Sequence, residues 1–70
     1  MEQVKIFHDR TWNTLTVWFG DPQEETLCEE TGEEVLLMKD RAGRVIGFEK
    51  LNFAVSSPDQ LRISFETVTL

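Results

Sequence analysis

The chain has 70 residues, a formal net charge of −6 and 40% apolar residues, and it contains one Cys and one His. These values predict a single folded domain over residues 1–70. They exclude an internal disulfide, a structural zinc site and, because no apolar run exceeds four residues, a membrane-spanning helix, while the acidic balance argues against nucleic-acid binding.

The first half of the chain predicts a hairpin followed by a short edge strand. Residues 4–7 and 15–19 are rich in β-branched and aromatic side chains, which favour strands. The polar residues 8–13 between them predict a loop of about six residues. Pro22 ends the second strand because it cannot donate to a ladder, and residues 26–29 form the expected edge strand.

Two further strands, over residues 35–39 and 44–51, flank a tight turn. Asp40 stands at the first turn position, where its carboxylate can accept backbone N–H groups. Gly43 stands where a positive φ would produce a bulged hairpin. The pattern therefore predicts that these two strands pair antiparallel.

The C-terminal part predicts a helical turn and a last strand. Ser56, Ser57 and Pro58 form a capping pattern that indicates one helical or 3₁₀ turn near residues 57–61. Apolar side chains then alternate with polar ones over residues 61–67, which predicts a half-buried strand. The expected fold is therefore all-β, an antiparallel meander of five to six strands.

The strand expected over residues 44–51 is apolar on both faces except at Glu49 and Lys50. A strand that is wet on neither face must be covered on both sides. Either another layer of this chain or a second copy provides that cover. Because so short a chain without a disulfide or metal buries little surface, we expect a homo-oligomer.

Charge is distributed unevenly along the chain. Residues 1–35 carry −7 and residues 36–70 carry +1, and seven acidic side chains without a base fall between Asp21 and Glu34. Such a run is typical of a solvated surface that keeps a small protein soluble. It could instead be a docking surface for a basic protein partner. The alternating pattern of a calcium-binding loop is missing, which disfavours a cation site.

Two stretches, residues 5–17 and 40–51, resemble a family of small bacterial proteins, domain of unknown function 2283. The first is similar to the family's opening, in which a strand, an Asp, a short loop and a second strand follow one another. The second is similar to the family's ending, Asp-x-x-Gly-x-Val-x-Gly-x-Glu-x-Leu. The family-motif residues in this chain are Asp9, Asn13, Asp40, Gly43, Gly47 and Glu49.

The chain departs from the family pattern at His8, where Tyr is usual, at Asn13, where Asp is usual, and in the tail over residues 52–70. Any charge-dependent role of a carboxylate at position 13 would be lost here. The resemblance implies a compact β-rich module with no established activity and no cofactor. Family members often look like the non-toxic partner of a small ribonuclease-like toxin, which suggests an antitoxin-like role.

Few side chains could carry catalysis. His8 is the only group with an ordinary pKa near neutrality, and Asp9 beside it would point to the opposite face of a strand. Cys28 lies among acids, which raise a thiol pKa. We therefore expect no catalytic, metal or cofactor site and a protein that is not an enzyme. The alternative is an enzyme or divalent-metal site formed between subunits by His8, Asp9, Asp40 and Glu49.

Three side chains have both structural and recognition interpretations. Glu49 follows Gly47 on an apolar strand, and we expect it to accept backbone donors or to pair with a cross-strand base; the alternative is recognition at an interface. Trp18 either fills a second layer or anchors an interface, and Trp12 is expected to close the end of the core. The N-terminus lacks the features of a signal peptide, so we predict a cytoplasmic β module that acts by contact with protein.

Overall fold

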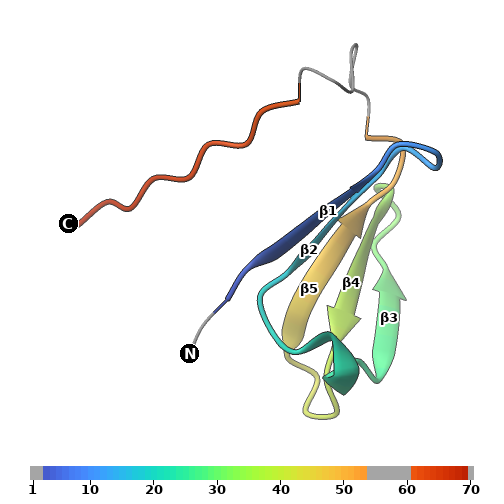
Figure 1. The fold of residues 1–70 in the computed structure, drawn as a ribbon. Coiled ribbons are helices and arrows are strands. Elements are labelled where there is room, and N and C mark those ends of the chain that lie inside the picture. The colour runs from blue at the N-terminus through green and yellow to red at the C-terminus, as the bar shows by residue number, and fades with distance from the viewer. Residues whose placement is uncertain (1–2, 54–60, 70) are drawn as a thin grey trace.

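The computed structural model describes residues 3–53 and 61–69, and its regular elements form one antiparallel sheet of five strands with a single 3₁₀ turn (Figure 1). The elements are β1 (Lys5–Asp9), β2 (Thr14–Trp18), η1 (Pro22–Glu24), β3 (Leu27–Glu30), β4 (Val35–Lys39) and β5 (Val45–Lys50). The predicted all-β antiparallel fold is confirmed. No helix in the described part of the chain has the length and hydrophobicity that crossing a bilayer requires.

The strand order is β1-β2-β5-β4-β3, so one connection departs from a simple meander. After β2 the chain passes along the end of the sheet through η1 and returns on the far edge as β3 (Figure 1). Backbone hydrogen bonds fix this path, since the N–H groups of Phe19 and Gly20 both donate to the Ile46 carbonyl at 3.0 and 2.9 Å. The apolar strand β5 thereby gains a neighbour on each side.

The β1–β2 hairpin closes through four residues, 10–13, rather than the six expected, because His8 and Asp9 continue the first strand. Oδ1 of Asp9 accepts the N–H groups of Thr11 and Trp12 at 2.9 and 3.0 Å. Trp12 is 77% exposed, so the expectation that it closes the core is wrong: the turn holds its backbone and leaves its ring in solvent.

The described helical turn lies at η1, where the sequence pattern predicted only the end of a strand. Asp21 caps it by accepting the Gln23 N–H at 2.9 Å, and Pro22 occupies its first position. This is the same cap-plus-proline pattern that predicted a turn near residues 57–61. Most of that second segment, residues 57–60, lies outside the described residues.

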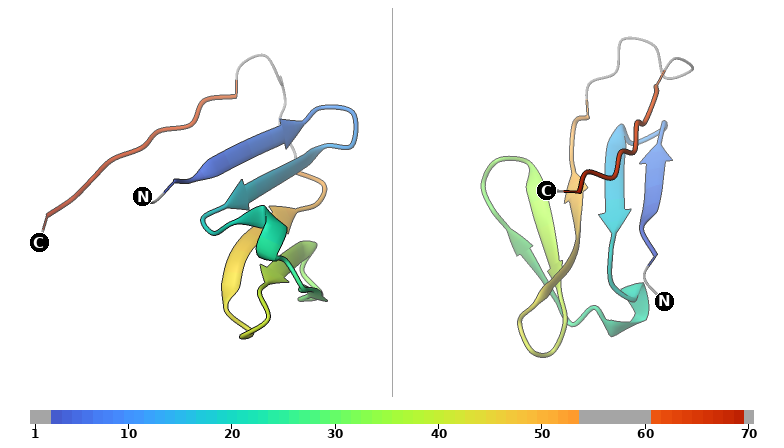
Figure 2. Two further views of the ribbon diagram at one scale, coloured as in Figure 1. Left: turned by 60° about the horizontal axis from the view of Figure 1, so that its bottom comes forward. Right: turned by 90° about the vertical axis from the view of Figure 1, so that its left-hand side faces the viewer.

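The sheet is a single layer, and no helix or second sheet of the described chain packs on either face (Figure 2). Among residues 3–53 and 61–69, only two apolar side chains are buried, Met38 at 4% and Ile46 at 8% exposure. The described part of the chain therefore does not provide the double cover expected for β5. Ile46 lies against the backbone at Gly20, where a Cβ would be 2.7 Å from the Ile46 Cβ, while many other apolar side chains keep much of their surface in solvent.

Cross-strand register defines two faces, because directly paired residues share a face. We call one the Phe48 face; its apolar members are Ile6, Leu15, Val17, Val35, Leu37 and Phe48. We call the other the Trp18 face; its apolar members are Phe7, Trp18, Leu36 and Met38. Both faces of the sheet are therefore substantially apolar.

The segment over residues 61–69 is extended but forms no strand, and it runs away from the sheet (Figure 1). Phe65 is 87% and Ile63 56% exposed. The expectation of a half-buried strand at residues 61–67 is thus wrong for the isolated chain. The alternation of apolar and polar side chains is present, but none of the five described strands pairs with this segment.

Candidate functional site

Asp40 is the most heavily engaged of the family-motif residues. Its Oδ1 accepts the N–H groups of Ala42 and Arg44, each at 2.9 Å, and its Oδ2 accepts Nε of Arg44 at 3.0 Å. The Asp40 side chain is buried, and the hydrogen bond from the Arg44 backbone, aided by the charge and side-chain donor of the same arginine, lowers the pKa of the carboxyl group. Asp40 therefore builds the β4–β5 turn.

Asp40→Asn is expected to lower the melting temperature by several degrees at pH 7 and to weaken the loss of stability in acid. The folded-state pKa of Asp40 lies below its ordinary 3.8, so the ionised carboxylate stabilises the fold above that value. The contribution disappears as pH falls through the folded pKa. Thermal unfolding followed from roughly pH 7 to pH 2 measures it, and a variant whose profile parallels that of the wild type throughout would contradict this role.

Two other motif positions supply left-handed backbone. Gly43 has φ 81° and donates its N–H to the Asp40 carbonyl at 3.0 Å, which confirms the predicted turn. Asn13 has φ 56°, and its carbonyl accepts the Phe53 N–H at 2.8 Å. Asn and Asp tolerate this conformation better than most residues, so Asn13 preserves the backbone geometry at a position where the resembling family usually carries Asp.

Gly47 makes room for Trp18. A Cβ at position 47 would lie 2.7 Å from the Val17 carbonyl oxygen and 2.8 Å from Cε3 of Trp18, so the indole lies against the bare backbone of β5. Met38 pairs with Gly47 from the other side. This close approach places Trp18 within the sheet's own packing, where it is half-buried.

Glu49 lies on the Trp18 face between Thr16 and Leu36, its cross-strand neighbours on β2 and β4. Neither neighbour is a base, and the Glu49 side chain forms no hydrogen bond or ion pair with any residue in 3–53 or 61–69. The expected pairing with a cross-strand Lys or Arg is therefore wrong. The bases on the adjacent strands lie elsewhere: Lys39 pairs with Glu29 at 2.6 Å.

The residues considered for catalysis do not converge. His8 lies on the Phe48 face, where its ring meets Phe53 edge-on with centroids 5.7 Å apart, whereas Asp9 projects to the other face. Partial desolvation on the sheet raises the pKa of the Cys28 thiol, and the Glu25 and Glu49 carboxylates add to the shift. Within the described residues, no group of three or more His, Cys, Asp or Glu side chains could hold a metal ion.

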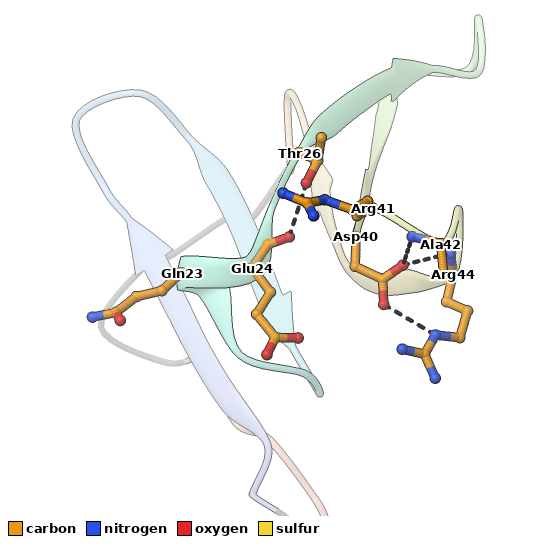
Figure 3. Close-up of a pocket in the computed structure, with 7 residues that line it drawn as sticks. All are labelled: Gln23, Glu24, Thr26, Asp40, Arg41, Ala42 and Arg44. Atoms are coloured by element: carbon orange, nitrogen blue, oxygen red, sulfur yellow. Dashed lines mark hydrogen bonds and ion pairs between the residues drawn. The ribbon is translucent and has the colours of Figure 1, made fainter.

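A hollow of about 460 Å³ lies between η1 and the β4–β5 turn (Figure 3). It is lined by Gln23, Glu24, Thr26, Asp40, Arg41, Ala42 and Arg44. The Asp40 carboxylate and the Arg44 Nε bond one another, and the Thr26 hydroxyl donates to the Glu24 carbonyl at 3.3 Å. Each of these bonds lies within one of the two segments, whereas the Thr26 N–H donates to the Lys39 carbonyl at 2.8 Å and joins them. The polar groups that line the hollow do not converge as an acid, a base and a nucleophile would.

Two surfaces of the described chain stand out. Both sheet faces are apolar, and the seven acidic side chains between Asp21 and Glu34 are all exposed along η1, β3 and the turn that follows. Sequence patterns identified the acidic run and the apolar strands. They gave no signal for the Arg41 and Arg44 hollow or for the contact between His8 and Phe53, because these depend on how distant segments meet.

Comparison with known proteins gives one match, to the family described as Protein of unknown function (DUF2283), over residues 5–53. Neither the curated proteins nor the solved structures give a significant match. The match includes all five strands and every motif residue discussed above, and it stops before the extended segment at 61–69. The chain belongs to the DUF2283 family, whose function is unknown.

Proposed function

We propose that the protein is a non-enzymatic, cytoplasmic module that acts by protein contact and assembles as a homo-oligomer. The observation that carries this proposal is the single-layer sheet with apolar side chains on both faces. Ile6 is 41% and Phe7 56% exposed, although they lie on opposite faces of the same strand. Exposed apolar surface of this kind is typical of interaction sites.

The total surface supports the same proposal. The chain exposes 5962 Å², whereas a compact monomer of this mass exposes about 4,500 Å². The excess of about 1,500 Å² exceeds the roughly 800 Å² that each partner buries in a standard interface. The exposed segment over residues 61–69 contributes to this excess, so a second copy that covers this segment and part of the sheet would bring the surface of each chain closer to that of a compact protein.

The acidic surface suits a basic protein partner, in line with the antitoxin-like role that the family resemblance suggests. Of its seven carboxylates, Glu29 pairs with Lys39 and Glu34 with Lys50 at 3.4 Å. The remaining ones add to a negative field that would attract a basic surface and orient it. The partner is expected to be encoded beside this gene as a small basic protein, and co-expression of the two chains tests whether they form a complex.

Static light scattering at micromolar concentration tests self-association. The expected mass is about twice the 8.1 kDa of the single chain. Sedimentation equilibrium over a tenfold concentration range would then give the dissociation constant. A mass that remains at 8.1 kDa throughout would overturn the proposal of a homo-oligomer.

A further inference from the structure

The two edges of the sheet differ in how they are protected. At the β3 edge the strand has four residues and carries Glu29 and Glu30, both exposed. Short, charged edge strands discourage pairing with another chain. The β1 edge is one residue longer and has the charged Lys5 and Asp9 at its two ends, with the exposed apolar Ile6 and Phe7 between them and Val4 just before it at 57% exposure. The β1 edge is therefore the open one.

The chain also contains an extended segment without a partner strand. Residues 61–69 are extended, they lie beyond the family match, and no other described element pairs with them. Leu61, Ile63 and Phe65 alternate with polar side chains, as in a strand with one buried face. The same chain therefore has an open edge strand and an extended segment without a partner strand.

We propose that residues 61–69 of a second copy pair antiparallel with β1, with Glu66 opposite Lys5 and Arg62 opposite Asp9. Each pair places an acidic side chain opposite a basic one, and the same register produces both pairs. The same register sets Phe65 opposite Ile6, so the apolar side chains of the segment extend the Phe48 face. Among the described residues, Lys5, Arg62 and Glu66 form no other ion pair.

Neighbouring registers lose either the two charge pairs or the alignment of the apolar side chains with the Phe48 face. A slip of one residue sets Ser64 or Glu66 opposite Ile6 and turns the apolar side chains to the wrong face. A slip of two residues sets Arg62 or Glu66 opposite Phe7 and breaks both charge pairs. The complementarity therefore selects one arrangement.

The occupant is a second copy because the segment runs away from its own sheet (Figure 1) and because surface remains to be covered. Reciprocal exchange gives each copy one donated and one accepted strand, which closes a two-fold dimer and removes the open edge. This inference rests on the proposed homo-oligomer and specifies its interface.

The test is a charge exchange between two variants, Lys5→Glu and Glu66→Lys. Each variant alone places two like-charge pairs in its homodimer and is expected to raise the dissociation constant roughly ten- to thirtyfold. An equimolar mixture forms a heterodimer in which both pairs are again complementary, so the wild-type affinity should return. Sedimentation equilibrium of each variant and of the mixture measures this. Arg41→Glu and Glu30→Lys, at exposed positions, control for the change in net charge.

Each result of these measurements supports or overturns strand exchange between copies. Recovery on mixing supports strand exchange between copies. Recovery only when both substitutions share one chain shows docking on the chain's own edge and overturns the exchange, as does a pair of variants no weaker than their controls. A wild-type protein that is monomeric overturns the proposed homo-oligomer together with this interface, whereas a wild-type dimer unaffected by the variants overturns the interface alone.

Discussion

Gly47→Ala is expected to lower the free energy of unfolding by about 2 to 3 kcal/mol, the upper part of the range for inserting a methyl group into a packed site. The added Cβ would lie 2.7 Å from the Val17 carbonyl oxygen and 2.8 Å from Cε3 of Trp18. The Val17 carbonyl belongs to a strand paired on both sides and cannot move freely. Urea unfolding at fixed protein concentration measures the change, since self-association would make stability depend on concentration.

Gly32→Ala is the matched control for Gly47→Ala. A Cβ at position 32 meets nothing within 4 Å, so this substitution costs only the strain of φ 87°, about 1 kcal/mol. Removal of the indole by Trp18→Leu in the Gly47→Ala background should recover part of the loss, because the two side chains compete for one space. A loss at Gly47 no larger than that at Gly32, or strictly additive effects with Trp18, would contradict the packing described for Gly47.

The parts of the fold that the sequence predicts correctly are local. The turn at Asp40 to Gly43 depends on side chains within four residues of one another, so its residue types suffice to predict it. The strands at 35–39 and 45–50 likewise follow from residue type and length. The connection from β2 to β3 could not be predicted in this way, because the path of the chain depends on η1. The β2–β5 pairing also joins residues about thirty positions apart.

Sequence patterns are least reliable for predicting which side chains are buried and which residues they pack or pair with. Trp12 is of a residue type that usually packs in a core, but its side chain lies in solvent. The turn that Asp9 stabilises gives the ring no described layer to pack against. Glu49 has the context of an ion-paired residue, but the strands beside it supply Thr16 and Leu36. In both cases the residue type is informative only once the partner across the strand or layer is known.

Surface features likewise divide into those that consecutive residues reveal and those that depend on the strand order. The acidic run is a property of consecutive residues and could be recognised directly, whereas the open β1 edge required the strand order. Edge position follows from pairing alone, and no residue type marks β1 as an outer strand. The contrast between adjacent acids on β3 and an apolar pair flanked by opposite charges on β1 appears only after both are known to be edges.

Phe65→Asp is expected to raise the dissociation constant of the dimer by at least about a hundredfold, because burial of a Phe side chain contributes about 1.5 to 3 kcal/mol and a two-fold dimer buries two. In the isolated chain Phe65 is 87% exposed and contacts no strand, so its replacement should not disturb the folding of the single chain. The effect should therefore appear in association and not in the monomer. Sedimentation equilibrium measures it, and circular dichroism of dilute protein checks that the sheet is retained.

Ser64→Asp provides the control for Phe65→Asp. It adds the same charge one residue away, at a position that alternation places on the other side of the segment, opposite Phe7 in the proposed register. We expect it to weaken the dimer only a few-fold, as a single charged substitution beside an apolar residue at an exposed edge. If the two variants weaken the dimer equally, charge alone explains the loss and Phe65 does not enter a partner's sheet. If only Phe65→Asp weakens it strongly, the side of the segment that carries Leu61, Ile63 and Phe65 is the side that a second copy covers.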